Sequence, residues 1–325
     1  DLETESRYQL TSPRLHKIWA TVFYGDALMT LANQTRAYEN EKGAADALVK
    51  IWMGRIDTQF TTNHGVAKRD MILNFNEMAR SFSQIPVTYT PKVKVGVVGE
   101  IYVKYSPLGN NELEHFLHGE DCEVNLPGLM GFVQYCVANT SETIHLYGGS
   151  KLVALATNCI AHFLSEREKL MIAAIRRYPQ FHAPTLFSAT RKMASGVIGY
   201  GNKMGEGWLL TAEMMELQSI GFENIVCAQP FGCLPNHICG KGMINKIRAI
   251  YPHANITPID YDPSATRVNQ ENRIKLMLSV AKERLDNREP PRGGALTPVA
   301  PPLYGDIAVP AVTVPSFSER APANV

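Results

Sequence analysis

Hydrophobic positions along the chain switch repeatedly between helical spacing and continuous β-branched runs. Apolar residues at helical spacing predict helices over 15–33, 44–55, 67–82, 112–117, 129–137, 151–177, 185–195, 209–220, 238–250 and 266–284. Continuous apolar runs predict strands over 93–103, 122–124, 224–228 and 255–260. The β-branched run 93–103 is typical of a strand that is buried on both faces of a parallel sheet. This alternation predicts an α/β fold with a parallel sheet, preceded by helices.

Breaks in these patterns divide the chain into four parts. Residues 1–87 are predicted to form a helical segment, which ends in the linker 86–91. Residues 88–148 and 149–286 are each expected to contain a flavodoxin-like α/β lobe, the second with additional helices. Residues 287–325 contain eight of the 20 prolines and few bulky apolar side chains. We therefore expect this tail to be disordered and removable without a change in melting temperature.

Composition and charge narrow the classes of partner. The chain has 325 residues and a formal net charge of +1, which gives no reason to expect nucleic acid or an anionic membrane as a partner. The longest apolar run, 152–164, is interrupted by Thr157, Asn158 and His162, and falls short of the ~18 residues of a membrane span. Six cysteines in a chain of this length do not form a disulfide scaffold. We expect a cytoplasmic protein and, because the first residue is Asp1, part of a longer one.

The stretch 225–241 carries the most informative chemistry, because it holds Cys227, Cys233 and Cys239. Prolines and a glycine form a turn here between a predicted strand and a predicted helix. Ligands of open parallel sheets bind at the carboxyl ends of strands, and a helix start favours a thiolate. Cys233 is therefore the candidate functional thiol, of the kind that binds iron–sulfur clusters. Inert burial of free cysteines is the alternative, and we favour it for Cys239, whereas Cys227 lies either next to the site or in the core.

Two loops supply further candidates. Glu100 lies within the clearest predicted strand and either faces a cleft or caps a neighbouring element, and Asn110 lies in the loop after that strand. The loop 199–208 contains four glycines and Glu206. Glycines let the backbone approach a ligand closely, and the following helix start is suited to an anion such as a phosphate. A flexible connection is the alternative for this loop. The spacing excludes the dinucleotide and Walker A fingerprints.

Several other residues favour structural roles. Arg36 and Glu39 fit a solvated helix end, and Asp260 and Asp262 fit capping better than metal binding. The remaining cysteines lie in ordinary strand or helix patterns and are expected to pack in the core: Cys122, Cys136 and Cys159.

Three blocks of sequence resemble the C-terminal part of large acyl-CoA dehydratase activase proteins, the relatives of 2-hydroxyglutaryl-CoA dehydratase and benzoyl-CoA reductase components. The blocks are 95–104 with 109–111, 201–208, and 227–237 with 240–243, 259–262 and 268–277. Residues 36–43 are similar to a fourth, weaker block. The resemblance spans about residues 15–285.

The resemblance implies an iron–sulfur component of an ATP-driven 2-hydroxyacyl-CoA dehydratase or activase system, which transfers a low-potential electron to an acyl-CoA. In such proteins three cysteines hold a [4Fe–4S] cluster. Cys233 matches one of them, with Cys227 nearby, and the other two and the ATPase activase part are expected upstream of residue 1. Glu100, Asn110 and Glu206 would line the catalytic site. The alternative is a non-catalytic α/β docking module without a cluster.

Overall fold

The computed structural model describes residues 11–287. Its helices are α1 (Ser12–Arg36), α2 (Ala44–Thr61), α3 (Lys68–Ser83), α4 (Ile101–Tyr105), α5 (Leu113–Gly119), α6 (Leu129–Tyr147), α7 (Lys151–Ile175), α8 (Phe187–Ala194), α9 (Gly207–Ser219), α10 (Ile244–Ile250) and α11 (Arg267–Asp286). Its strands are β1 (Val93–Gly99), β2 (Cys122–Asn125), β3 (Asn224–Pro230) and β4 (Asn255–Tyr261). A π-helical turn η1 (Asn236–Gly240) and a 3₁₀ turn η2 (Lys241–Met243) precede α10. The predicted tail from 288 onward lies outside the described residues.

The four strands form one parallel sheet in the order β2-β1-β3-β4. The predicted α/β class with a parallel sheet and N-terminal helices is confirmed. Strands that we assigned to two lobes belong to the same sheet, because β1 pairs directly with β3, from Val95 opposite Asn224 to Gly99 opposite Ala228. The central strand β1 is almost entirely buried, as its β-branched composition requires.

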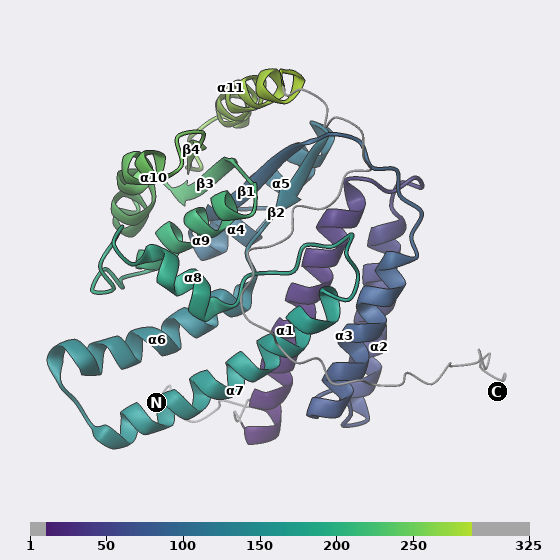
Figure 1. Ribbon diagram of the computed structural model, residues 1–325, viewed down its shortest axis with the longest axis vertical. Helices are drawn as coiled ribbons and strands as arrows, with labels where there is room; N and C mark the ends of the chain where they lie inside the picture. The colour runs from purple at the N-terminus through teal and green to yellow at the C-terminus, as the bar shows by residue number, and fades with distance from the viewer. Residues whose placement is uncertain (1–10, 288–325) are drawn as a thin grey trace.

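Helices cover both faces of the sheet (Figure 1). On one face α5 and α11 pack on Val95, Val97 and Val226, and on the other α9 and α10 pack on Val98 and Ile225. Successive strand residues point to opposite faces, so β1 and β3 contribute to both cores. This layering leaves the carboxyl ends of β1 and β3 next to each other, where the connecting loops meet.

The N-terminal helices form a separate core with α6 and α7, built around Phe23, Trp52 and Phe75. α6 and α7 run side by side, and the turn that joins them lies far from the sheet (Figure 1). The prediction that Cys136 and Cys159 pack in the core is wrong, because both lie on exposed faces of these two helices, whereas Cys122 is buried as predicted. Among the described helices, none combines the length and apolar character needed to cross a membrane.

The clearest predicted strand is shorter than its apolar run. β1 ends at Gly99, and the apolar residues that follow belong to α4. Glu100 begins this helix, because its Oε2 accepts a hydrogen bond from the Val103 amide at 2.8 Å. A strong cap after a glycine therefore overrides the β propensity of Ile101 and Val103.

We expect Gly99→Ala to destabilise the protein by about 3 kcal/mol or more, because the cost of overpacking is added to the cost of backbone strain. A Cβ at Gly99 would lie 1.9 Å from the carbonyl oxygen of Ala228, and the residue has a φ of +152°. Urea denaturation measures the change. Gly131→Ala is the matched control, since a Cβ there meets nothing within 4 Å and should not destabilise α6. Equal effects of the two substitutions would contradict this account.

Candidate functional site

The strand order creates a switch point between β1 and β3. From β1 the chain continues to β2 on one side, whereas β3 and β4 extend the sheet on the other. Ligands of open α/β sheets bind outside the carboxyl ends of the strands at such a point. The residues that follow β1 and β3, together with Glu206 from the loop before α9, form the candidate site, which we call the switch-point edge: Glu100, Glu206, Cys233 and Asn236.

Glu100 closes the β1 side of this edge. Its backbone amide donates to the carbonyl oxygen of Ala228 at 3.0 Å, which extends the β1–β3 pairing by one residue. Its carboxylate caps α4 through the Val103 amide. Of the two interpretations left open by the sequence, the structure shows the cap.

Cys233 lies on the β3 side of the edge, in the turn between β3 and η1. Its amide donates to Pro230 O at 3.1 Å, and its carbonyl accepts from the His237 amide at 3.0 Å. The side chain is half-buried. Asn236 donates through Nδ2 to the sulfur of Cys233 at 3.0 Å. The turn thus holds the thiol against a buried amide at the end of a strand.

Glu206 joins the two sides of the edge. Its Oε1 accepts from the Ile101 amide at the start of α4 at 3.1 Å, and its Oε2 accepts from Asn236 Nδ2 at 3.3 Å. Glu206 is buried, with 6% of its surface exposed. The structure therefore brings together Cys233 and Glu206, which the sequence proposed as site residues. The bridging residue, Asn236, was not identified, although it lies three residues after Cys233, in the predicted turn before the helix 238–250.

The glycine-rich loop before α9 is tightly packed at its end, at Gly207 and Trp208, whereas most of 199–205 is exposed. A Cβ at Gly207 would lie 2.2 Å from Asn202 O, and the Trp208 amide donates to the same oxygen at 2.7 Å. The Trp208 side chain is fully buried, and its Nε1 donates to Asn139 Oδ1 at 3.0 Å. Gly207 is required for this packing, and it follows Glu206, whose carboxylate lies at the edge.

Other predicted site residues lie in the core. Cys227 is fully buried in β3, and burial raises the pKa of its thiol to about 12. Cys239 is buried, which raises the pKa of its thiol too. Asn110 is buried after α4, where it donates to Val103 O at 2.8 Å and accepts from the Leu113 amide at 3.0 Å. The two cysteines therefore pack in the core, and the hydrogen bonds of Asn110 cap the neighbouring helices.

Two aspartates near the end of β4 make local contacts. Asp260 accepts from Gln229 Nε2 at 2.6 Å, and Asp262 accepts from the amide and hydroxyl of Ser264 at 2.7 Å. Asp262 therefore stabilises a turn, while α11 begins later, at Arg267. Within residues 11–287 no three His, Cys, Asp or Glu side chains are grouped so that they could hold a metal ion.

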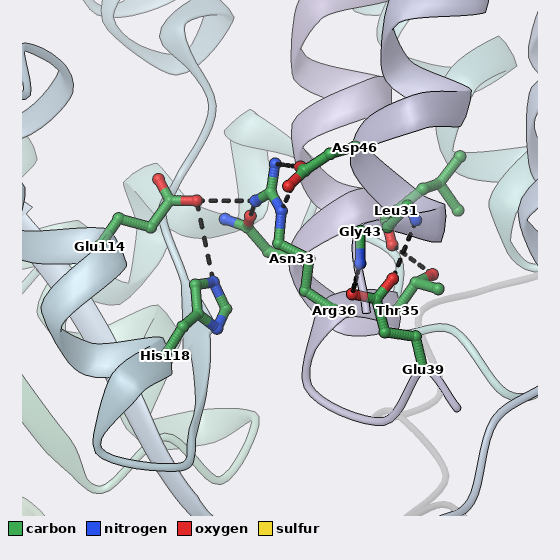
Figure 2. A network of polar contacts seen from close by, with 10 residues as sticks. Leu31, Asn33, Thr35, Arg36, Glu39, Gly43, Asp46, Glu114 and His118 are labelled. Carbon is green, nitrogen blue, oxygen red and sulfur yellow. Dashed lines mark hydrogen bonds and ion pairs between the residues drawn. The ribbon is translucent and has the colours of Figure 1, made fainter. Parts of the chain in front are cut away.

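A second polar network lies between the N-terminal helices and α5 (Figure 2). The Arg36 guanidinium donates to Asp46 at 2.7 Å and to Glu114 at 2.8 Å, and so ties α1 to α2 and α5. Glu39 is buried, and it accepts from the amides of Gly43 and Ala45 at 2.7 and 2.9 Å. The predicted solvated helix end is therefore wrong, because both side chains form contacts that fix the turn between α1 and α2.

These contacts line an open groove of about 630 Å³. Two carboxylates already pair with Arg36, and His118 Nε2 lies 3.9 Å from Glu114. The charge of Arg36 is thus already neutralised by these carboxylates, and Arg36 is not free to bind an anion.

A third feature is an internal cavity of about 70 Å³ between α1, α7 and α9. Four carboxylates line it: Asp26, Glu168 and Glu213, which are buried, and Glu216, which is half-buried. Burial raises the pKa of Asp26 to about 6 and those of Glu168 and Glu216 to about 7. Hydrogen bonds from backbone amides, such as those of Leu129 and Met130 to Asp26, offset part of the cost of burial.

No protein-family model, curated protein or solved structure matches the chain.

Proposed function

We propose that the chain is an iron–sulfur component of an ATP-driven 2-hydroxyacyl-CoA dehydratase or activase type system, with Cys233 as a ligand of a [4Fe–4S] cluster. The observation that carries the proposal is the position of Cys233. It is half-buried at the switch-point edge, and Asn236 donates to its sulfur at 3.0 Å. A cluster ligand must be a thiolate, and hydrogen bonds to the sulfur tune the potential of such a cluster.

The described residues supply one ligand and do not fit a complete cluster by themselves. Cys227 and Cys239 are buried, and Cys122 is buried at the amino end of β2. The exposed thiols, Cys136 and Cys159, belong to α6 and α7. In this proposal, further ligands therefore come from residues outside 11–287 or from another polypeptide, as does the ATPase activase part. Glu206 and Glu100 orient the edge through their contacts with α4.

We expect Cys233→Ala to remove iron and sulfide from the complete gene product purified anaerobically, because a ligand of the cluster is lost. Cys159→Ala removes a thiol on the exposed face of α7 and should keep both, so it is the matched control. Colorimetric iron and sulfide analysis and the visible spectrum measure the outcome. Parent protein that holds no iron, or a Cys233→Ala variant that holds as much as the parent, would sink the proposal.

A docking module is the second candidate, because exposed apolar side chains surround the same thiol. Phe231 and Leu234 flank Cys233 in the sequence, and 71% and 67% of their surfaces are exposed. Ile238 and Met204 lie in the adjoining η1 turn and glycine-rich loop, with 46% and 75% exposed. Exposed apolar groups gathered at one edge mark interaction sites. Iron-free protein that still binds a partner through Phe231 and Leu234 would favour this function.

A further inference from the structure

The first half of α7 has the composition of a buried helix, but it lies on the surface. Ten of the twelve residues 151–162 are exposed, and they include Leu152, Leu155 and Ile160. The one buried side chain in this stretch, Thr157, is polar. In an ordinary surface helix the apolar side chains face the core, and a helix that is apolar on all sides is normally covered. This half of α7 therefore has the character of a contact surface.

The end of α6 and the turn after it extend the same surface. Leu146 and Tyr147, the last residues of α6, are both exposed. The turn lies at the margin of the molecule, away from the sheet (Figure 1). Sixteen of the eighteen residues 145–162, which we call the hairpin tip, are exposed. An interface of standard size takes about 20–30 residues from each side, so the hairpin tip supplies most of one side.

Charged residues are depleted in this part of the chain. Residues 124–165 contain two, Glu142 and Lys151, whereas the average of 19% for the whole chain would give about eight in these 42 positions. Glu142 pairs with Arg191 of α8, which leaves Lys151 as the one charge of this stretch without an ion pair among the described residues. Depletion of charge is typical of the core of a protein interface, where apolar area is buried.

From these observations we infer that the hairpin tip is the interface of a homodimer, in which α7 packs antiparallel on α7 of a second copy. A nearly uncharged surface is complementary to itself, and a twofold interface uses the same patch on both copies. In the antiparallel arrangement the two Lys151 residues lie at opposite ends of the contact. At a rise of 1.5 Å per residue they are about 16 Å apart, where salt screens most of their repulsion. The inference does not depend on the role of Cys233.

Other occupants fit the hairpin tip less well. Surfaces that bind anionic lipids usually carry a cluster of about four to eight Lys or Arg residues. The hairpin tip has Lys151 and, at its rim, Lys203, whose Nζ lies 5.5 Å from the centre of the Tyr147 ring. A strongly acidic or basic protein partner would likewise find few opposite charges to pair with. A second copy matches both the apolar character and the low charge of this surface.

Sedimentation velocity of the purified chain at several concentrations tests the inference. The parent should form dimers as its concentration rises, and the double variant Leu152→Glu with Leu155→Glu should remain a monomer, because the contact would bury four unpaired carboxylates. Both leucines are exposed in the single chain, so the variant should keep the circular dichroism spectrum of the parent. Leu276→Glu on α11, where 70% of the leucine is exposed, is the matched control and should still form dimers.

Alkylation of Cys159 gives a second readout. Cys159 is exposed and follows Leu155 by four positions, which places it on the same face of α7. Its reaction with iodoacetamide, followed by peptide mass spectrometry, should slow severalfold as the parent dimerises and stay fast in the double variant. A dimer that the double variant leaves intact would overturn the inference. A monomeric parent would overturn it too: a protected Cys159 would then indicate cover by residues outside 11–287, and flotation with phosphatidylserine vesicles would indicate a lipid surface.

Discussion

Raising the pH from about 5 to about 8 is expected to lower the free energy of unfolding by several kcal/mol. Three carboxyl groups that line the internal cavity cause this loss. Burial raises the pKa of Asp26 to about 6 and those of Glu168 and Glu216 to about 7. In the unfolded chain such groups lose their protons near pH ~4. Protons held only by the folded state stabilise it at low pH, and this stabilisation disappears as the pH rises through the folded-state pKa values.

The size of the effect follows from the same values. A difference of one pKa unit between the folded and the unfolded state corresponds to about 1.4 kcal/mol of stability. The three groups together therefore contribute on the order of 5 kcal/mol or more. Carboxylates whose pKa is lowered act in the opposite direction, but their effect changes only below pH ~4, outside this range: Glu77, Glu114, Glu166 and Asp262. Burial lowers the pKa of His182, and this group offsets a part of the decline.

Urea denaturation at several pH values, combined with glutamine substitutions, tests this prediction. Glu168→Gln with Glu216→Gln mimics the protonated groups and should flatten the decline between pH ~5 and ~7. Glu166→Gln on the exposed face of α7 is the matched control and should keep the slope of the parent, because this residue pairs with Lys169 at the surface. A stability that rises with pH over this window would show that these carboxyl groups are ionised in the folded protein.

The sheet could be predicted because each strand has a local signal. The β-branched run from Val93 and the apolar runs at β2 and β3 are buried on both faces, so composition alone indicates them, whereas the edge strand β4 is only partly buried. The end of β1 could not be predicted, since it depends on one hydrogen bond from Val103 to Glu100. The pairing of β1 with β3 joins residues more than 120 positions apart, and no local pattern records it.

The site residues Cys233 and Glu206 could be predicted because turn-forming residues surround them in the sequence. Prolines and glycine around Cys233 marked a strand end, and the glycine-rich loop marked the position of Glu206. Asn236 was missed because a buried amide in a helix start has the same local sequence as an exposed one. Arg36 was misjudged for a related reason, since its partner Glu114 lies 78 residues away.

Lys104 is the clearest case of a residue whose environment cannot be predicted from the local sequence. Nothing in the sequence distinguishes it from an exposed lysine. In the structure it lies in α4 with its side chain 4% exposed, and Nζ contacts Glu213 Oε1 and Oε2 at 3.0 and 3.1 Å. Glu213 belongs to α9, so the pair links the helix after β1 to a helix that packs on the sheet. We expect Lys104→Met to lower the free energy of unfolding at neutral pH by about 3–5 kcal/mol, because it leaves a buried carboxylate without its cation.

A double-mutant cycle separates the pair from simple packing. Burial already raises the pKa of Glu213, and Lys104 opposes that change. Without Lys104, the carboxyl group must take up a proton to stay buried, so the variant should lose less stability at pH ~5 than at pH ~8. Adding Glu213→Leu removes the orphaned charge and should restore most of the lost stability, since buried pairs are often replaceable by apolar side chains. Lys169→Met, at an exposed pair, should cost less than about 1 kcal/mol. A double variant as unstable as the sum of its singles would mean that the two side chains act independently, and α4 would then be held to α9 by packing alone.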